Sequence, residues 1–121
     1  MKQQIIVAGL GRFGSSLAAG LYQIGHDVMA IDNNEKRVQD IMGNVTYAIE
    51  ADATDETALE ELAVKNFDAA VVAIGSSIQS SIMATVLFKT MDIKFIVARA
   101  RNRLHGETLA RIGADLVVKP E

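Results

Sequence analysis

The sequence predicts an α/β fold in which helices cover both faces of a doubly wound sheet of six parallel strands. Short β-branched apolar runs alternate with helical patterns along the chain, which is typical of βαβ units. The run at residues 69–74 is apolar throughout, as expected for a central parallel strand buried on both faces. With 121 residues, the chain has the length of one domain, so we expect residues 1–121 to form a single unit.

The predicted elements follow one another in strict alternation. Strands are expected at residues 4–8, 27–31, 46–49, 69–74, 95–98 and 116–118. Helices are expected at residues 14–24, between the Asn33-Asn34 pair and Gly43, from Thr54 or Asp55 through Ala63, from the serine-rich turn 76–81 to about 91, and at 102–112. The inner face of the third helix is expected to carry Leu59, Leu62 and Ala63. Gly25 and Gly113 have the positions of left-handed residues that end helices.

The turn at residues 9–14 has the sequence GLGRFG, a G-x-G-x-x-G motif between a predicted strand and a predicted helix. Gly9 allows the tight turn, Gly11 lets the backbone approach a pyrophosphate, and Gly14 lets the helix pack against the strand. Negative charge on a ligand would meet free N–H groups at the positive end of the helix. Glycine-rich turns also join strands to helices for steric reasons alone. The residues downstream must therefore decide whether this turn binds a nucleotide. The whole pattern is a Rossmann fold, for which right-handed crossovers favour the strand order 3-2-1-4-5-6.

Asp32 lies about 20 residues beyond the glycines, at the end of the second predicted strand, where this fold places an acid. Its carboxylate can accept hydrogen bonds from both ribose hydroxyls of an adenosine, and it would repel the 2′-phosphate of NADP. Asn33, the next residue, is included in the candidate site. The alternative is that an aspartate at a strand end serves as a cap for the following helix.

Asp52, Ala53 and Thr54 follow the third predicted strand, which neighbours the second in this strand order. We expect them beside the adenine, where Asp52 would bind the amino group or shape the loop through Thr54. Capping of the next helix is the alternative for this segment, and for Thr54 it has about equal weight.

Ala73, Ile74 and Gly75 end the fourth predicted strand on the other side of the switch point, where a nicotinamide or phosphate tail would pass. Gly75 would permit close approach of the backbone to the ligand. The serines that follow are either ligands or helix caps. No G-x-S-x-G motif surrounds them, which excludes a hydrolase nucleophile of that kind.

Arg12 is unusual within the glycine turn, because simple dinucleotide binders rely there on backbone N–H groups. A guanidinium at this place suits an additional phosphate, such as the γ-phosphate of ATP, whereas the alternative is a solvent-facing arginine. Phe13 is included in the candidate site, although its side chain is more typical of a core residue. Arg99 points toward the ligand edge by its position at a strand end, and Arg101 and Arg103 are expected to be solvated.

Composition excludes several classes of function. A net charge of −3 with scattered basic residues argues against a nucleic-acid partner. The apolar runs are strand length, far below the roughly 20 residues that span a bilayer, so no direct membrane insertion is expected. The absence of cysteine agrees with a cytoplasmic setting. The chain's two histidines, His26 and His105, are expected at the surface and too far apart to share a metal.

An oxidoreductase is the alternative function, since the same fold carries NAD in dehydrogenases. Hydride transfer needs a general acid or base beside the nicotinamide. The Tyr-x-x-x-Lys pair of short-chain dehydrogenases is missing, because Tyr22 is followed four residues later by His26 and Tyr47 by Ala51. We therefore expect a protein that is not an enzyme. A sensor of the NADH/NAD ratio that acts on another protein is a third hypothesis.

Several stretches together resemble, over nearly the full chain, the N-terminal nucleotide-binding domain of the Ktr and Trk potassium-uptake regulators, also called the RCK, KTN or TrkA-N domain. The matching stretches are VAGLGRFG at 7–14, ID at 31–32, ADAT at 51–54, FD at 67–68, VVAIG at 71–75, IQSS at 78–81, IGAD at 112–115 and PE at 120–121. Arg12 looks like the signature of the Ktr branch. The family's C-terminal ligand-binding domain is not present in this chain.

The resemblance implies regulation. Such domains bind ATP, ADP or NAD(H), assemble as homodimers and then octameric rings, and dock on the inner face of the plasma membrane through a potassium-translocating membrane protein that they gate. By position, Asp32 would hold the ribose, Asp52 the adenosine side, Arg12 the terminal phosphate, and Arg99 a phosphate where relatives often have lysine. Glu121 matches a glutamate that helps bind a divalent cation at the dimer interface in some relatives.

Overall fold

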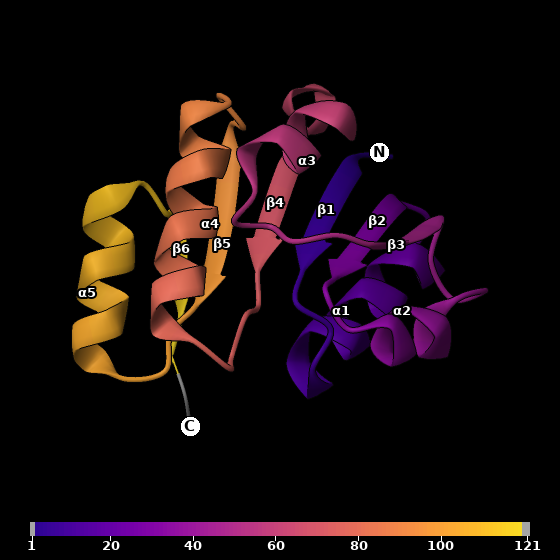
Figure 1. Cartoon of the computed structure of the whole chain (residues 1–121), viewed down its shortest axis with the longest axis horizontal. Coiled ribbons are helices and arrows are strands. Elements are labelled where there is room, and N and C mark those ends of the chain that lie inside the picture. The colour runs from indigo at the N-terminus through magenta and orange to yellow at the C-terminus, as the bar shows by residue number, and fades with distance from the viewer. Residues whose placement is uncertain (1, 120–121) are drawn as a thin grey trace.

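A computed structural model describes residues 2–119. Its six strands form one parallel sheet with the order β3-β2-β1-β4-β5-β6, which confirms the predicted fold and strand order. The strands are β1 (Gln4–Ala8), β2 (Asp27–Asp32), β3 (Tyr47–Glu50), β4 (Ala69–Val72), β5 (Phe95–Arg99) and β6 (Leu116–Val118). Each neighbouring pair is parallel, so all carboxyl ends lie at one edge of the sheet (Figure 1). The order reverses between β1 and β4, and ligands of open α/β sheets bind at such a switch point.

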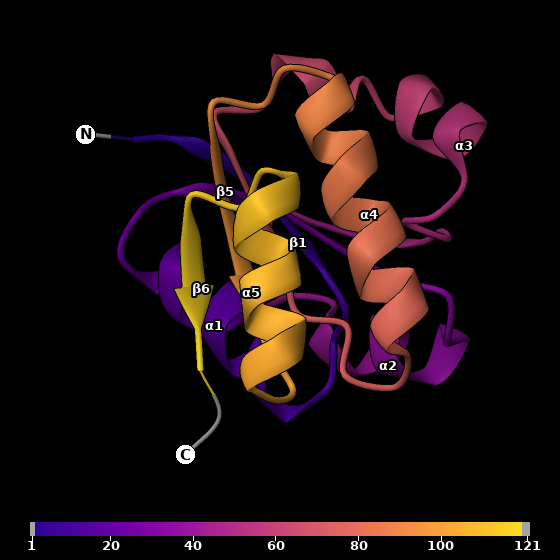
Figure 2. The ribbon, with the colours of Figure 1, turned by 90° about the vertical axis from the view of Figure 1, so that its left-hand side faces the viewer.

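Helices cover the sheet on both faces, and each face has its own apolar core. The helices are α1 (Arg12–Gln23), α2 (Glu35–Ile41), α3 (Glu56–Glu61), the 3-10 helix η1 (Val64–Asn66), α4 (Ile78–Thr90) and α5 (Arg103–Ile112). One core gathers buried side chains of α1 and α2, represented by Ala18 and Ile41. The other gathers those of α3, α4 and α5, represented by Leu59, Phe88 and Leu109, and Figure 2 shows α4 and α5 side by side over the sheet.

Several boundaries differ from expectation by one or two residues, among them the end of β4 at Val72 rather than residue 74, and two differences have identifiable reasons. Helix α1 begins at Arg12 rather than residue 14, because Gly11 is already the extended N-cap, with φ −71° and ψ −164°. The prediction that Ala63 lies on the inner face of the third helix is wrong. Ala63 is exposed with φ +55°, and the chain turns there into η1, where Val64 takes the buried position instead.

The glycine turn packs directly on the end of β4. Gly9 has φ +101°, and a Cβ atom at this position would lie 2.6 Å from the carbonyl oxygen of Ala73. A Cβ on Gly14 would overlap the Gly9 carbonyl oxygen and lie 3.1 Å from the Cβ of Ala73. These contacts support the predicted roles of Gly9 in the turn and of Gly14 in close helix packing. Within residues 2–119, no helix combines the length and apolar character needed to cross a bilayer.

Candidate functional site

A pocket of about 530 Å³ lies over the glycine turn at the carboxyl ends of the strands. Except for Gly14, which lies beneath the turn, every candidate site residue in the described part of the chain lines this pocket. The lining residues are Gly9, Gly11, Arg12, Phe13, Ile31, Asp32, Asn33, Arg37, Ala51, Asp52, Ala53, Thr54, Ala73, Ile74, Gly75, Ser76, Ser80, Arg99, Ala100 and Arg101. The fold thus brings together segments from both halves of the sequence, as expected at a switch point.

Asp32 is buried, with 8% of its surface exposed, and holds two backbone segments in place. Its Oδ2 accepts a hydrogen bond from the Leu10 N–H at 2.8 Å, and its Oδ1 accepts one from the Asn34 N–H, also at 2.8 Å. The side-chain cap of α2 is Asn34, whose Oδ1 accepts from the Arg37 N–H at 3.2 Å. Each carboxylate oxygen has two lone pairs, so these two hydrogen bonds leave one acceptor site on each oxygen of Asp32.

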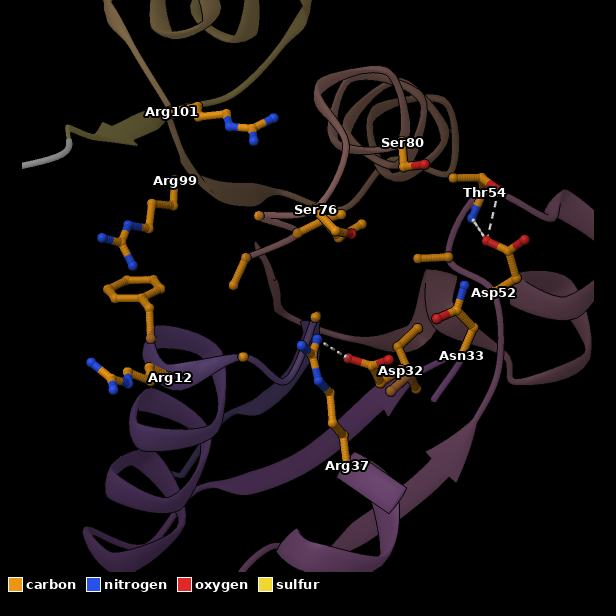
Figure 3. Close-up of a pocket in the computed structure, with 18 of the residues that line it drawn as sticks. Arg12, Asp32, Asn33, Arg37, Asp52, Thr54, Ser76, Ser80, Arg99 and Arg101 are labelled. Carbon is orange, nitrogen blue, oxygen red and sulfur yellow. Dashed lines mark hydrogen bonds and ion pairs between the residues drawn. The ribbon is translucent and has the colours of Figure 1, made fainter. Parts of the chain in front are cut away.

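Arg37 was not predicted as a site residue. It lies in the first turn of α2, and its Nη1 is 3.7 Å from Oδ2 of Asp32, with half of the arginine side chain exposed (Figure 3). The sequence did contain a signal for Arg37, namely its position five residues after Asp32. A helix that starts just after a strand places its first turn at the same edge of the sheet as the end of that strand.

The loop after β3 is shaped by Asp52 and Thr54. Oδ1 of Asp52 accepts hydrogen bonds from the Thr54 N–H at 2.8 Å and from the Thr54 hydroxyl at 2.6 Å. The cap of α3 is Asp55, which accepts from the N–H groups of Thr57 and Ala58. Capping is therefore the role of Asp55, while Asp52 and Thr54 face the pocket (Figure 3).

The loop after β4 forms the opposite wall. Ala73 still continues the pairing with β1, since its N–H donates to the Ala8 carbonyl at 2.8 Å. Ser77 is the cap of α4 and accepts from the Ser80 N–H at 3.1 Å. Ser76 and Ser80 both line the pocket, so the serine-rich turn contributes to the helix cap and to the pocket wall alike.

Three arginines lie along one side of the pocket, away from Asp52 and Thr54 (Figure 3). Arg12 comes from α1, Arg99 from the end of β5, and Arg101 from the loop after it. The Cζ of Arg99 lies 4.7 Å from the ring centroid of Phe13, a cation–π contact across the switch point. Phe13 also packs against the α1 core. Arg101 is exposed, as expected, and it also lines the pocket.

The expectation that His105 lies at the surface is wrong: only 4% of its surface is exposed. It lies in the first turn of α5 and faces α4, where its Nε2 is 3.1 Å from Oγ of Ser81. Burial, reinforced by the charge of Arg101, lowers the pKa of His105 below its ordinary value. His26 is partly exposed, and its Nδ1 accepts a hydrogen bond from the Gln3 N–H.

No cluster of three or more potential metal ligands occurs among residues 2–119. The predicted cation ligand Glu121 lies outside the described residues.

The six-stranded sheet, its glycine turn and the pocket above the turn define a Rossmann-type α/β domain. Comparison with known families shows which group of Rossmann-type domains this is. The chain belongs to the TrkA-N domain family, whose model matches residues 5–120, and this confirms the family resemblance seen in the sequence.

Two curated relatives come from Bacillus subtilis (strain 168). Ktr system potassium uptake protein A is 43% identical over 119 residues, which are 98% of this chain and 54% of that protein. Ktr system potassium uptake protein C is 41% identical over 121 residues, which are 100% of this chain and 55% of that protein. The chain thus spans about half the length of these relatives.

Solved structures agree on the fold. The crystal structure of the GsuK RCK domain superposes with a TM-score of 0.83 at 25% identity, covering 97% of this chain and 25% of that one. The GsuK channel bound to NAD superposes with a TM-score of 0.84 at 18% identity, covering 98% and 21%. A further structure of GsuK is bound to ADP, with a TM-score of 0.82 at 18% identity, covering 98% and 31%.

Proposed function

We propose that this domain binds an adenine nucleotide in the pocket over the glycine turn and that the bound nucleotide regulates potassium transport through a membrane partner. Membership of the TrkA-N family and the names of the Ktr relatives support the potassium role. The GsuK structures that hold NAD and ADP support a nucleotide as the ligand. The observation that carries the proposal is the division of charge in the pocket, with Asp32 and Asp52 at one end beside Arg37, and Arg12, Arg99 and Arg101 at the other.

The pocket fits an adenosine at its carboxylate end. Asp32 retains one acceptor site on each oxygen, which matches the two hydroxyl donors of a ribose. The loop of Asp52 and Thr54 lies farther along the same edge, beyond β2, where the base would follow the ribose. Arg37 faces the same carboxylate as the ribose would, so it can contact the ribose or the base.

The phosphates would then cross the glycine turn toward the three arginines. A Cβ on Gly11 would meet no atom within 4 Å, so this side of the turn is open to a ligand. Arg12, Arg99 and Arg101 offer planar forks of N–H donors, the geometry that suits phosphate oxygens. The terminal phosphate of ATP or ADP would lie on the side of these arginines, and the third phosphate of ATP would gain a further contact. We therefore propose ATP or ADP as the main ligands and NAD(H) as a further one.

The chemistry of the lining supports regulation rather than turnover. The ionisable side chains among the described lining residues are four arginines and two aspartates, and arginine keeps its proton at physiological pH. We therefore propose a binding site and not an oxidoreductase. A bound ligand shifts a protein between states only by its differential affinity for them, and a terminal phosphate on Arg12 would supply such a difference between ATP and ADP.

Assembly belongs to the same proposal. On the family resemblance, we propose that the whole protein forms homodimers and octameric rings at the cytoplasmic face of the membrane, with Glu121 available to a divalent cation. The sequence of this chain contributes the nucleotide-binding part of that assembly.

Calorimetry tests the nucleotide site. The wild-type chain should bind ATP, and Arg12→Ala should weaken ATP by about 1.5 to 3 kcal/mol, the contribution of a hydrogen bond to a charged group, with little change for NAD. Arg111→Ala is the matched control, because Arg111 is an exposed arginine at the far end of α5. Equal ATP affinities in wild type and Arg12→Ala would refute the assignment of the terminal phosphate.

The ribose contact is tested by changing the ligand rather than Asp32, because Asp32 also accepts hydrogen bonds from the backbone. We expect 2′-deoxy-ATP to bind wild type more weakly than ATP, by about 1.5 to 3 kcal/mol for one charged hydrogen bond. Identical affinities would exclude the 2′-hydroxyl as a partner of Asp32. Steady hydride transfer from NADH to an added acceptor would contradict the regulatory function itself.

The potassium role is tested in cells. Cells that make this chain within its whole protein and matched cells with Arg12→Ala are compared for rubidium uptake, with Arg111→Ala as the control. We expect uptake to change only with Arg12→Ala. Unchanged uptake in that variant, despite lost ATP binding, would separate the nucleotide site from transport.

A further inference from the structure

His105 is a buried polar side chain that the proposed function does not use. It stands in the first turn of α5, where its N–H donates to the cap residue Asn102 at 2.8 Å. The side chain continues the inner face of the helix, one turn before the fully buried Leu109. A histidine at such a position replaces an apolar residue, and its two ring nitrogens therefore need partners.

Both ring nitrogens have partners, and together these define the tautomer. Nδ1 lies 2.9 Å from the backbone nitrogen of Arg101 and accepts a hydrogen bond from that N–H, so Nδ1 carries no proton. The proton of the neutral ring is then on Nε2, which donates to Oγ of Ser81 at 3.1 Å. The neutral imidazole thus joins the loop after β5 to α4.

One end of this connection lies in the pocket wall, and the other lies directly behind it. Arg101 lines the pocket, as does Ala100 before it. Ser81 follows Ser80, which also lines the pocket, and is itself fully buried in the first turns of α4. Figure 3 shows Arg101 and Ser80 on either side of the upper part of the pocket. The imidazole lies behind this wall and spans it.

We propose that His105 is a positioning residue of the nucleotide site, which in its neutral form holds Arg101 and the start of α4 in register and on protonation releases Arg101. The inference rests on the proposed function, because it concerns the affinity of the same pocket for its ligand. A protonated ring would turn Nδ1 into a donor that faces the donor N–H of Arg101. Nucleotide affinity should therefore fall as the pH falls through the pKa of His105.

The surroundings of His105 do not offset the charge of an imidazolium. Arg101, from the loop after β5, is positively charged, and α4 contributes the neutral Ser81. On α5, Arg103 and Glu107 are exposed and pair with each other at 3.6 Å. Burial and the charge of Arg101 both lower the pKa of His105, so the neutral ring prevails at neutral pH. Release of Arg101 requires acidification below the usual range of histidine.

The test uses the fact that the chain has only two histidines. ATP affinity is measured by calorimetry from pH 7.5 down to the lowest pH at which circular dichroism shows an intact fold. The variants are wild type, His105→Gln and His26→Gln. A glutamine at 105 can accept a hydrogen bond from the Arg101 N–H and donate one to Ser81, and it does not titrate. His26 lies at the amino-terminal end of β1, opposite the pocket, and serves as the matched control.

The expected result is a difference between variants, because titration of ATP itself affects all three equally. Wild type and His26→Gln should lose affinity on acidification by up to about tenfold per pH unit beyond any loss in His105→Gln, the limit for one coupled proton. At pH 7.5, His105→Gln should bind ATP nearly as wild type does, and Ser81→Ala should bind it more weakly while keeping the pH dependence. Parallel pH profiles for wild type and His105→Gln would overturn the proposal.

Nuclear magnetic resonance separates failure of this inference from failure of the proposed function. Long-range ¹⁵N–¹H spectra should show the proton of His105 on Nε2, and the Arg101 amide should shift with the same midpoint as the ring. A chain that binds no adenine nucleotide at any pH would refute the proposed function. An Arg101 amide that does not follow the His105 titration would refute the positioning role, whether or not the nucleotide binds.

Discussion

Gly14 and Gly20 allow one substitution to be compared at two places in the same helix. Both lie in α1, and both are changed to alanine. At Gly14, the added Cβ would overlap the carbonyl oxygen of Gly9, which is backbone and cannot rotate away, and would lie 3.1 Å from the Cβ of Ala73. At Gly20, which is exposed, the added Cβ would meet no atom within 4 Å.

These contacts set the sign and size of each effect. Alanine is favoured over glycine inside a helix by about 1 kcal/mol, so Gly20→Ala should raise the free energy of unfolding by about 0.5 to 1 kcal/mol. Gly14→Ala gains the same helix preference but overpacks a rigid site, which typically costs about 1 to 3 kcal/mol and sometimes more. Because the overlap is with backbone, we expect a net loss of about 2 kcal/mol.

Urea unfolding measured by circular dichroism checks both values. With a slope of about 1 to 3 kcal/mol per molar urea, the midpoint of Gly14→Ala should fall by about 1 M and that of Gly20→Ala should rise by a few tenths. Gly14→Ala should also lose ATP affinity, because the turn must move to accommodate the methyl group. A Gly14→Ala protein as stable as wild type would refute the close packing of the turn, and a destabilised Gly20→Ala would refute its open surroundings.

Three further predictions concern stability. Asp115→Ala should lower the free energy of unfolding by about 1 to 3 kcal/mol, because Oδ2 of Asp115 accepts the Ile96 N–H at 2.8 Å, and Asp115→Asn should retain most of the stability in the same urea titration. Asp55→Ala should cost about 1 kcal/mol in thermal unfolding through loss of the α3 cap, whereas Asp55→Ser should restore most of it. The lowered pKa of His105 means that the unfolded chain binds its proton more tightly than the folded one. Its contribution to stability is therefore full above pH 6.5 and is lost as the pH falls from there toward the folded pKa, so the unfolding free energy of His105→Gln should depend less on pH there than that of wild type.

Much of the fold could be predicted from the sequence because its signals are local and agree with one another. Apolar runs, cap residues and glycines placed every strand and every α-helix, and the crossover rule then fixed the strand order. The end of the third helix could not be predicted in the same way. Ala63 continues the helical spacing, but the chain reverses there to bury Val64, and only tertiary packing determines that choice.

The lining residues of the pocket were predictable where they stand at strand ends. They were less predictable where a side chain enters the pocket from a helix or from a loop that follows a strand. Asp32, Asp52 and Arg99 are positioned by strand ends, whose location follows from topology. Arg37 and Arg101 depend on the directions of long side chains, which spacing alone does not determine. For His105 a signal was present, since it shares the spacing of the buried Leu109 on α5, but its polarity suggested the surface.

The hydrogen bonds of Asp32 connect the proposed ribose end of the pocket to the glycine turn. A change at Asp32 therefore also changes the geometry of the turn. Its carboxylate supports the N–H of Leu10, within the glycine turn 22 residues earlier in the chain, and the N–H of Asn34 at the start of α2. A variant made to alter sugar preference, such as Asp32→Ser for a 2′-phosphorylated ligand, would also remove the support of the turn. Engineering of ligand choice in this domain therefore requires a second substitution that restores an acceptor for the Leu10 N–H.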